Sequence, residues 1–119
     1  VMPVCYITLS ESVPLPSIDE INDIRDIVAE GLNSKVRTLD RNHIAVRVQK
    51  GERIFMLGEV EVEIFAQLYF DRFISRDKRA NFISHKITAL LKKNCATWIH
   101  MGMVGYSRVT TKGEVFFSD

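Results

Sequence analysis

The stretch SIDEINDIRDIVAEGL, residues 17–32, decides the fold because it predicts a long amphipathic helix. Its first residues form a capping-box pattern, in which Ser17 is followed three residues later by Glu20. Isoleucine, valine and leucine recur at spacings of three and four, at positions 18, 21, 24, 27, 28 and 32. One apolar stripe of this helix therefore faces a core.

A strand is predicted on each side of this helix. Residues 3–10 are rich in β-branched and aromatic side chains, which favour extended backbone. In residues 43–50, apolar side chains at positions 44, 46 and 48 alternate with Ala45, Arg47 and Gln49. The first half of the chain thus has the order strand, helix, strand.

The second half repeats this order. Residues 60–70 predict a strand. Its first half alternates valine and isoleucine with glutamates, so one face there is expected to be solvated, and its second half is apolar on both faces. Ser75 can cap a helix that runs to about residue 93, and residues 97–104 predict a fourth strand. Residues 105–119 predict a short hairpin or tail, with Val115, Phe116 and Phe117 as a candidate last strand.

The expected fold class is α+β, as a single domain over residues 1–119 made of two duplicated β-α-β units, at about 3–50 and 60–106. Each crossover helix makes its two strands parallel, which gives a four-stranded sheet with two helices on one face and a short extra C-terminal strand. The other face is left bare, although Ala45, Phe65 and Tyr69 are not residues for a solvated surface. A bare apolar face of this kind predicts self-association.

Composition narrows the function classes. The 119 residues include 16 Lys+Arg and 15 Asp+Glu, a formal charge of +1, and 46% hydrophobic residues. This excludes intrinsic disorder, a collagen-like chain and a disulfide scaffold, and no global basic field predicts a nucleic-acid partner. Cys5 and Cys95 match no zinc or redox spacing and are expected to be small buried hydrophobes. With no secretory signal and no membrane-length apolar run, a cytoplasmic protein without a membrane partner is expected.

One further pattern concerns the start of the chain. Pro3 follows Met2 at the beginning of a strand, and two β-α-β units come after it. With HIAVRV at 43–48, IFMLG at 54–58 and VGY at 104–106, the chain resembles the tautomerase superfamily, of the macrophage migration inhibitory factor and 5-carboxymethyl-2-hydroxymuconate isomerase type. The resemblance covers almost the whole chain as an architecture.

The resemblance implies that Pro3 is a catalytic general base that works without a cofactor. A free α-amino group has a pKa of about 7.7–8.0. Burial and nearby cations lower that pKa, so a neutral secondary amine can take a proton α to a carbonyl near pH 7. In this chain Val1 and Met2 precede Pro3, and an amide-linked nitrogen has no basic lone pair. Either these two residues are remnants that are removed, or the nitrogen is blocked and Pro3 only starts an edge strand.

Arginines are the expected substrate-binding groups. By resemblance Arg47 holds a substrate carboxylate, which its planar guanidinium suits; an ion pair with a third-strand glutamate is the alternative. Arg72 and Arg76, with Lys78 and Arg79, cluster at the start of the second helix, where backbone amides also favour an anion. Asp71 and Asp77 can instead neutralise this cluster on a solvated face. A second arginine after the first strand, present in some relatives, is missing from residues 10–13.

Aromatic residues complete the expected site. Tyr106 resembles the wall of the family's pocket, and Phe70 and Phe55 can line the same pocket, although all three also suit a core or an interface. His43, His85 and His100 have no metal-ligand spacing, so neither a metal nor another cofactor is expected.

The expected function is therefore that of a cofactor-independent tautomerase or isomerase acting on a small keto or enol acid. The resemblance, together with the bare face of the sheet, implies a homotrimer in which the active site lies at a subunit boundary and Arg47 serves a neighbour's Pro3. The alternative is a catalytically silent, ferredoxin-like module for binding or assembly that uses the same sheet. RNA binding on the sheet face has weak support, because Glu61 and Glu63 would repel phosphate.

Overall fold

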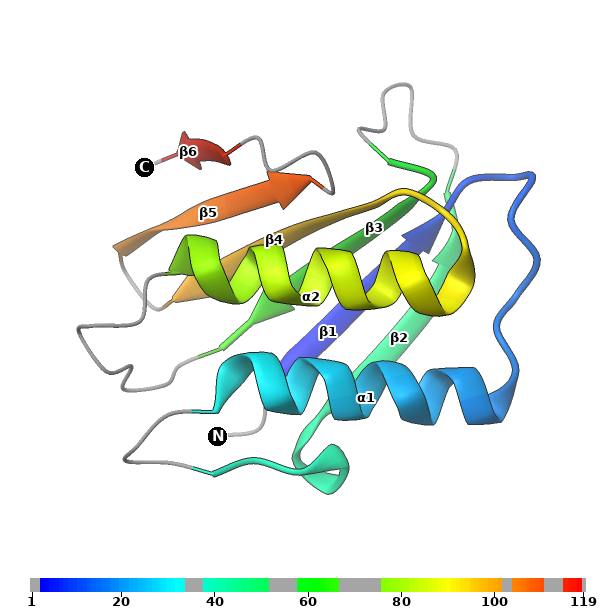
Figure 1. The fold of residues 1–119 in the computed structure, drawn as a ribbon, viewed down its shortest axis with the longest axis horizontal. Helices are drawn as coiled ribbons and strands as arrows, with labels where there is room; N and C mark the ends of the chain where they lie inside the picture. The colour runs from blue at the N-terminus through cyan, green and yellow to red at the C-terminus, as the bar shows by residue number, and fades with distance from the viewer. Residues whose placement is uncertain are drawn as a thin grey trace.

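The structure is a computed structural model, and it describes residues 3–33, 38–51, 58–66, 76–101, 104–110 and 115–118. Side chains are described within these ranges from residue 3 to residue 100, Arg76 excepted. The elements in chain order are β1 (Val4–Leu9), α1 (Ile18–Leu32), the 3₁₀ turn η1 (Arg41–His43), β2 (Ala45–Lys50), β3 (Val60–Phe65), α2 (Arg76–Leu91), β4 (Cys95–Met101), β5 (Val104–Thr110) and β6 (Val115–Ser118). The fold is α+β, with a mixed sheet and two helices (Figure 1).

The strands form one sheet in the order β2-β1-β3-β4-β5-β6. β1 and β2 are parallel neighbours, as are β3 and β4, while β1 and β3 are antiparallel. α1 lies between β1 and β2 in the chain, and α2 lies between β3 and β4. In a ferredoxin-like sheet the strands of each β-α-β unit are split by another strand. Here they are direct neighbours, so the ferredoxin-like form of the alternative fold is wrong.

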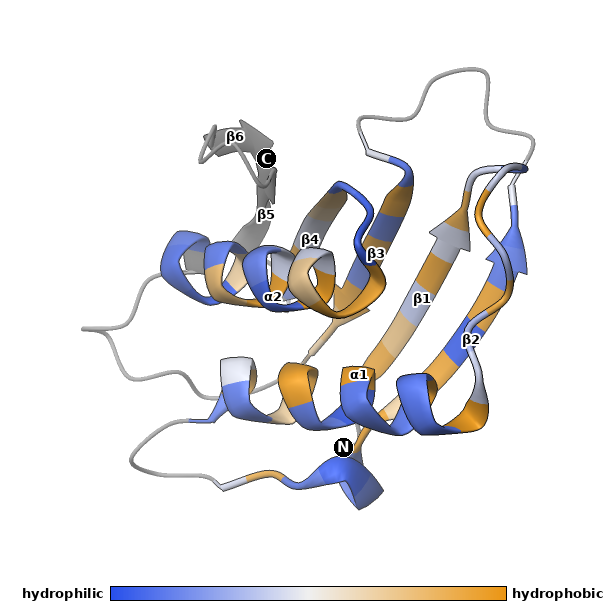
Figure 2. Cartoon of the chain, turned by 45° about the vertical axis from the view of Figure 1, so that its right-hand side comes forward, coloured by the Kyte–Doolittle hydropathy of each residue, from blue (hydrophilic) through white to orange (hydrophobic). Residues whose placement is uncertain are grey.

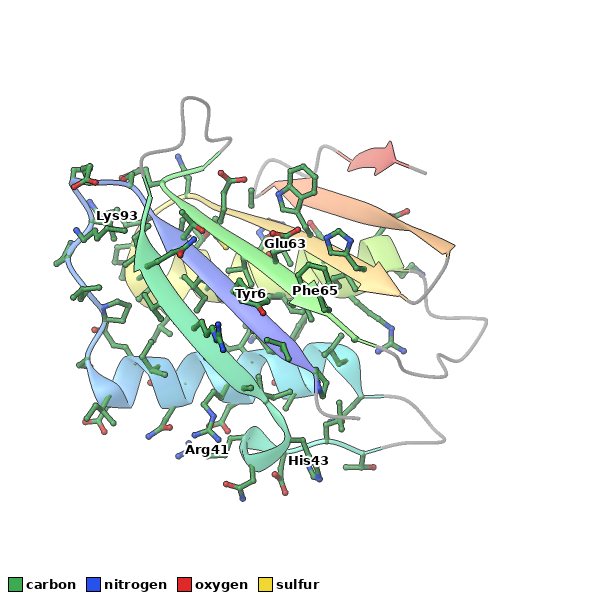
Figure 3. The ribbon with its side chains drawn as sticks, turned by 180° about the vertical axis from the view of Figure 1, so that it is seen from behind. Tyr6, Arg41, His43, Glu63, Phe65 and Lys93 are labelled. Atoms are coloured by element: carbon green, nitrogen blue, oxygen red, sulfur yellow. The ribbon has the colours of Figure 1, made fainter. Side chains whose placement is uncertain are left out.

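Both helices cover the same face of the sheet, as expected (Figures 1 and 3). The core lies between the helices and this face, because every second strand residue points toward the helices. Ile7, Val62 and Ile99 are fully buried there, together with Ile24 of α1 and Ile83 of α2. Figure 2 shows β1 as largely hydrophobic and both helices as amphipathic. The predicted apolar stripe of α1 is confirmed at positions 21, 24, 27, 28 and 32, whereas Ile18, the first residue of the helix, is 80% exposed.

The start of α1 follows the predicted capping box. The Glu20 N–H donates to Ser17 Oγ at 3.1 Å, and the Ser17 N–H donates to Glu20 Oε1 at 2.9 Å. The other end of α1 packs closely on α2, because a Cβ added to Gly31 would lie 2.5 Å from Cγ1 of Ile83. Glycine is therefore required at this helix crossing.

Several element limits differ from the expectation. β2 begins at Ala45 instead of residue 43, because Asp40 caps a 3₁₀ turn that includes His43. The fourth strand spans Cys95–Met101, and Val104 begins β5, which runs antiparallel to β4 and pairs with β6. The predicted four-stranded sheet is thus extended by two strands instead of one short strand. Ser75, residues 67–70 and residues 52–57 lie outside the described residues.

The second face of the sheet carries no helix, and we call it the open face (Figure 3). The glutamate-bearing side of β3, which was expected to be solvated, lies on this face, but only part of it is exposed to solvent. Phe65 is 43% exposed, whereas Glu61 is only 4% exposed and Thr8, beside it in the register, only 2%. The alternation of valine and glutamate thus gave the correct faces of β3, and the prediction that all its glutamates are solvated was wrong.

Within the described residues, neither helix is long and apolar enough to cross a membrane.

Candidate active site

Pro3 lies directly before β1, a strand with β2 on one side and β3 on the other. Its side chain is buried, and its carbonyl oxygen accepts a 3.1 Å hydrogen bond from the Ala45 N–H of β2. Proline suits this position because its fixed φ is compatible with extended backbone and no N–H is lost from the ladder. In this sequence the nitrogen of Pro3 is joined to Met2, and it is a base only in a chain that begins at Pro3.

A cation lies at the same end of the sheet as Pro3. Arg25 of α1 donates from Nε to the carbonyl oxygen of Ile44 at 3.1 Å, and from NH1 to Asn22 at 3.1 Å. Ile44 directly precedes Ala45, which bonds to Pro3. The guanidinium is thus held at the end of the sheet where Pro3 precedes β1.

Arg47 lies on the open face, as its alternation with Val46 and Val48 predicted, and it is exposed. Its guanidinium carbon lies 5.9 Å from the centre of the Tyr6 ring, which is its partner in the register of β1 and β2. Among the described residues, Arg47 makes this cation–π contact with Tyr6 and not the ion pair with a third-strand glutamate that was the alternative expectation. The reason is the strand order, because β1 separates β2 from β3.

Pro3 and Arg47 are not adjacent within one chain. Val4 pairs with Ala45 and Tyr6 with Arg47, so the register position of Arg47 is three residues along β1 from Pro3. At about 3.3 Å per residue, this places the two backbones roughly 10 Å apart along the strands.

The other predicted site residues are only partly described. Arg76 is the first residue of α2, and Tyr106 of β5 pairs with His100 in the register; the side chains of both are outside the described part. Phe70, Arg72, Phe55 and Tyr69 lie outside the described residues altogether.

Arg79 belongs to the predicted cationic cluster at the start of α2, but it does not face solvent. It is 3% exposed, and its NH1 donates to the carbonyl oxygens of Gly31 at 3.1 Å and Asn33 at 2.8 Å. These carbonyls end α1, where the last backbone acceptors lack helical partners and the dipole favours a cation. Arg79 therefore joins the two helices and does not point at a ligand in solvent.

The sequence reasoning missed a continuous group of side chains on the open face, which we call the aromatic row: Tyr6, Phe65, His100 and Glu63. The Tyr6 and Phe65 rings meet edge to face at 5.7 Å, and Phe65 and His100 stack at 4.4 Å with only 6° between their planes. His100 Nε2 lies 2.8 Å from Glu63 Oε1. Figure 3 shows Tyr6, Glu63 and Phe65 on this face. The alternation of side chains along β3 and β4 assigns these residues to one face. Only the register of the two strands shows which of them are neighbours.

Both cysteines are free and buried, as predicted. Burial raises the pKa of Cys95 to about 12, although a hydrogen bond with Thr97 acts in the opposite direction. Burial also raises the pKa of Cys5 far above its ordinary value. Neither thiol forms the thiolate that a nucleophile requires.

Within the described part of the chain, no group of three or more His, Cys, Asp or Glu side chains could hold a metal ion. Comparison with known protein families, curated proteins and solved structures finds no match for this chain.

Proposed function

We propose that the protein is a cofactor-independent tautomerase that moves a proton α to a carbonyl of a small keto or enol acid, and that Pro3 is its general base. The observation that carries the proposal is the position of Pro3, buried at the start of the internal strand β1 and bonded to β2 through its carbonyl. A proline held in this way has its nitrogen aimed by the sheet and shielded from water. Both effects favour a neutral, oriented amine in a chain that begins at Pro3.

The order of the elements supports the same proposal. Each half of the chain has two parallel neighbouring strands that are joined through a helix, and both helices lie on one face. We infer that the two halves are duplicated β-α-β units, because they share this arrangement about the antiparallel pair β1 and β3. This is the architecture that the resemblance to the tautomerase superfamily implied.

Arg47 is proposed to hold the substrate carboxylate. It is exposed, and Tyr6 orients its guanidinium without neutralising it. A bidentate guanidinium binds a carboxylate and stabilises the enolate that forms when the proton leaves. Arg72 and Arg76 remain proposed contacts for the acid, and Tyr106 and Phe70 the apolar wall.

We further propose a homotrimer in which the open faces meet. The exposed Phe65 ends the internal strand β3, Arg47 lies on the edge strand β2, and Glu61 and Glu63 lie on β3, two strands away from Arg47. In a closed ring, Arg47 on the edge strand β2 of one copy can meet β3 of the next copy, which carries Glu61 and Glu63. Opposite charges then face each other. Such a ring would also bring Arg47 to a neighbour's Pro3, which agrees with their separation within one chain.

The proposal is tested by the ketonisation of phenylenolpyruvate, a small enol acid. A chain that begins at Pro3 is compared with its Pro3→Ala variant, and we expect the rate of ketonisation by the variant to be lower by a factor of about 10² or more. Arg47→Ala should raise KM for this carboxylate, whereas Lys86→Ala, on the helix side of the molecule, should change neither constant. Equal rates for the proline and alanine chains would remove Pro3 from the mechanism.

A catalytically silent assembly module is the second candidate, and the aromatic row favours it. The stacked Phe65 and His100 present an apolar, partly exposed surface whether or not Pro3 is free. The mass of the native protein separates the candidates. A mass that corresponds to a chain beginning at Pro3 favours catalysis, and a mass that corresponds to a chain that keeps Val1 and Met2 favours assembly alone.

A further inference from the structure

The helix α1 carries a row of acids on the side that faces away from the sheet. Spacings of four, three and four residues place these acids on one side of the helix, opposite its buried stripe: Asp19, Asp23, Asp26 and Glu30. All four are exposed, and within the described part of the chain Asp26 is the one that forms an ion pair, with Arg41. We call these four residues the acidic row.

The outer side of α2 carries the opposite charge. Lys86 is exposed, and its Nζ lies 5.6 Å from the centre of the Phe82 ring, one turn earlier on the same helix. Lys92 directly follows the helix and is also exposed. Neither ammonium has a carboxylate partner among the described residues. The single acid of α2, Asp77, is half-buried in the first turn. We call Lys86 and Lys92 the basic pair.

The contact between Gly31 and Ile83 shows which residues of the two helices lie level with each other. α1 and α2 run side by side in opposite directions (Figure 1), and a Cβ on Gly31 would lie 2.5 Å from Cγ1 of Ile83. Glu30 comes one residue before this contact on α1, and Lys86 comes three residues after it on α2. At 1.5 Å per residue, Glu30 and Lys86 are level to within roughly 3 Å.

The same holds nearer the other end of the helix pair. Asp23 comes eight residues before the contact on α1, and Lys92 comes nine residues after it on α2. These two residues are therefore level to within about 2 Å. Each member of the basic pair thus has a member of the acidic row at its own height along the helices.

We propose that the outer side of the two helices binds a second copy of this chain, about a two-fold axis that runs parallel to the helices. Rotation about such an axis leaves every height along the helices unchanged and sets α1 of each copy against α2 of the other. The acidic row then meets the basic pair, and each contact occurs twice, with the facing pairs Glu30–Lys86 and Asp23–Lys92. A two-fold axis across the helices would set the acidic row against itself.

The two neighbouring charges favour a second copy over other partners. A polyanion on the basic pair would lie beside the acidic row, and a basic peptide on the acidic row would lie beside the basic pair, so one helix repels each of them. A second copy presents the two charges in the reverse order and is attracted by both helices. Helices of 15 and 16 residues are only about 22–24 Å long, and exposed ion pairs are individually weak. The dimer is therefore expected to be weak and sensitive to salt.

The test is sedimentation velocity of the full chain over a concentration series, in low salt (about 20 mM) and in high salt (about 500 mM). We expect the association constant of the unaltered protein to fall by a factor of about ten or more in high salt, because screening weakens the facing charges. Glu30→Lys and Lys86→Glu should each abolish this salt-sensitive step, since each sets like charges against each other. Glu11→Lys, at an exposed acid in the loop before α1, is the matched control and should keep it.

The two reversed variants give a sharper result when they are mixed. In a dimer of one Glu30→Lys chain and one Lys86→Glu chain, both copies of this facing pair are attractive again. The mixture should therefore regain the association that each variant lacks alone. A chain that carries both reversals should bind itself more tightly than it binds the unaltered protein.

Three results would overturn the dimer. The first is an association constant of the unaltered protein that does not depend on salt or that both reversed variants share. The second is a mixture of the two folded variants that fails to associate. The third is loss of association in Lys86→Glu with no change in Glu30→Lys, which would assign α2 to an anionic partner other than α1. None of these results bears on the open face, which lies on the opposite side of the sheet.

Discussion

The guanidinium of Arg79 on α2 donates a 2.8 Å hydrogen bond to the carbonyl oxygen of Asn33 at the end of α1. The same NH1 also donates to Gly31, and the side chain is buried. We expect Arg79→Met to cost about 2–4 kcal/mol in the free energy of unfolding, because it leaves buried carbonyls without a donor. Urea unfolding measures the loss, and the exposed neighbour Lys78→Met is the control. Equal effects of the two variants would contradict this role.

The contact of Gly31 with Ile83 predicts an unusual response to alanine. In an exposed helix, glycine to alanine stabilises by about 1 kcal/mol. Here the new Cβ would lie 2.5 Å from Cγ1 and 2.8 Å from Cδ1 of Ile83. Gly31→Ala should therefore destabilise by about 1–3 kcal/mol in chemical unfolding. Ile83→Val, which removes Cδ1, should restore part of that loss in the double variant, and a stabilised Gly31→Ala protein would show that the helices can separate at no cost.

Asp26 and Arg41 predict an acid-sensitive contribution to stability. Arg41 donates to both carboxylate oxygens, at 2.9 and 2.5 Å, and this hydrogen bonding lowers the pKa of Asp26 below its ordinary value of 3.8. A lowered pKa means that the contribution is present above about pH 4 and is lost as the pH falls through the folded-state value. Asp26→Asn should remove that part of the acid dependence. Melting temperatures from pH 7 to 2.5 measure it, and the effect should be small and salt-sensitive because both groups are exposed.

Arg25 predicts the pH dependence of the proposed catalysis. In a chain that begins at Pro3, this cation at the same end of the sheet should hold the pKa of the amine down, so the rate reaches its plateau at a lower pH. Arg25→Gln should move the rising limb of the pH–rate profile to higher pH, since the ammonium is then less disfavoured. Arg25→Lys keeps the charge and should leave the limb near its original place. An unmoved limb in a folded Arg25→Gln protein would remove Arg25 from the electrostatics of Pro3.

The sequence predicted what depends on neighbours along the chain. The capping box at Ser17 and Glu20 was correct, and so was the apolar stripe of α1 except at Ile18, because both depend on residues three and four apart. The faces of Arg47 and Phe65 were also correct, since alternation in a strand is local.

What the sequence could not predict depends on which strands pair and in which register. The stack of Phe65 on His100 exists because β3 and β4 align these two residues, which are 35 positions apart in the chain. Arg79 looks like a surface cation among its neighbours, and only the packing of α2 on the end of α1 buries it. The separation of Arg47 from the glutamates follows from the strand order, in which β1 lies between them.

The central claim concerns one atom, the nitrogen of Pro3, and it is tested most directly by two chains of otherwise identical sequence. One begins at Pro3, so that its nitrogen is an amine, and the other keeps Val1 and Met2, so that its nitrogen is an amide. The measurement is the rate of phenylenolpyruvate ketonisation at pH 7, with both chains shown to be folded by circular dichroism. We predict that the chain that begins at Pro3 is faster by a factor of about 10² or more. Equal rates for the two chains would contradict the claim that Pro3 is the base.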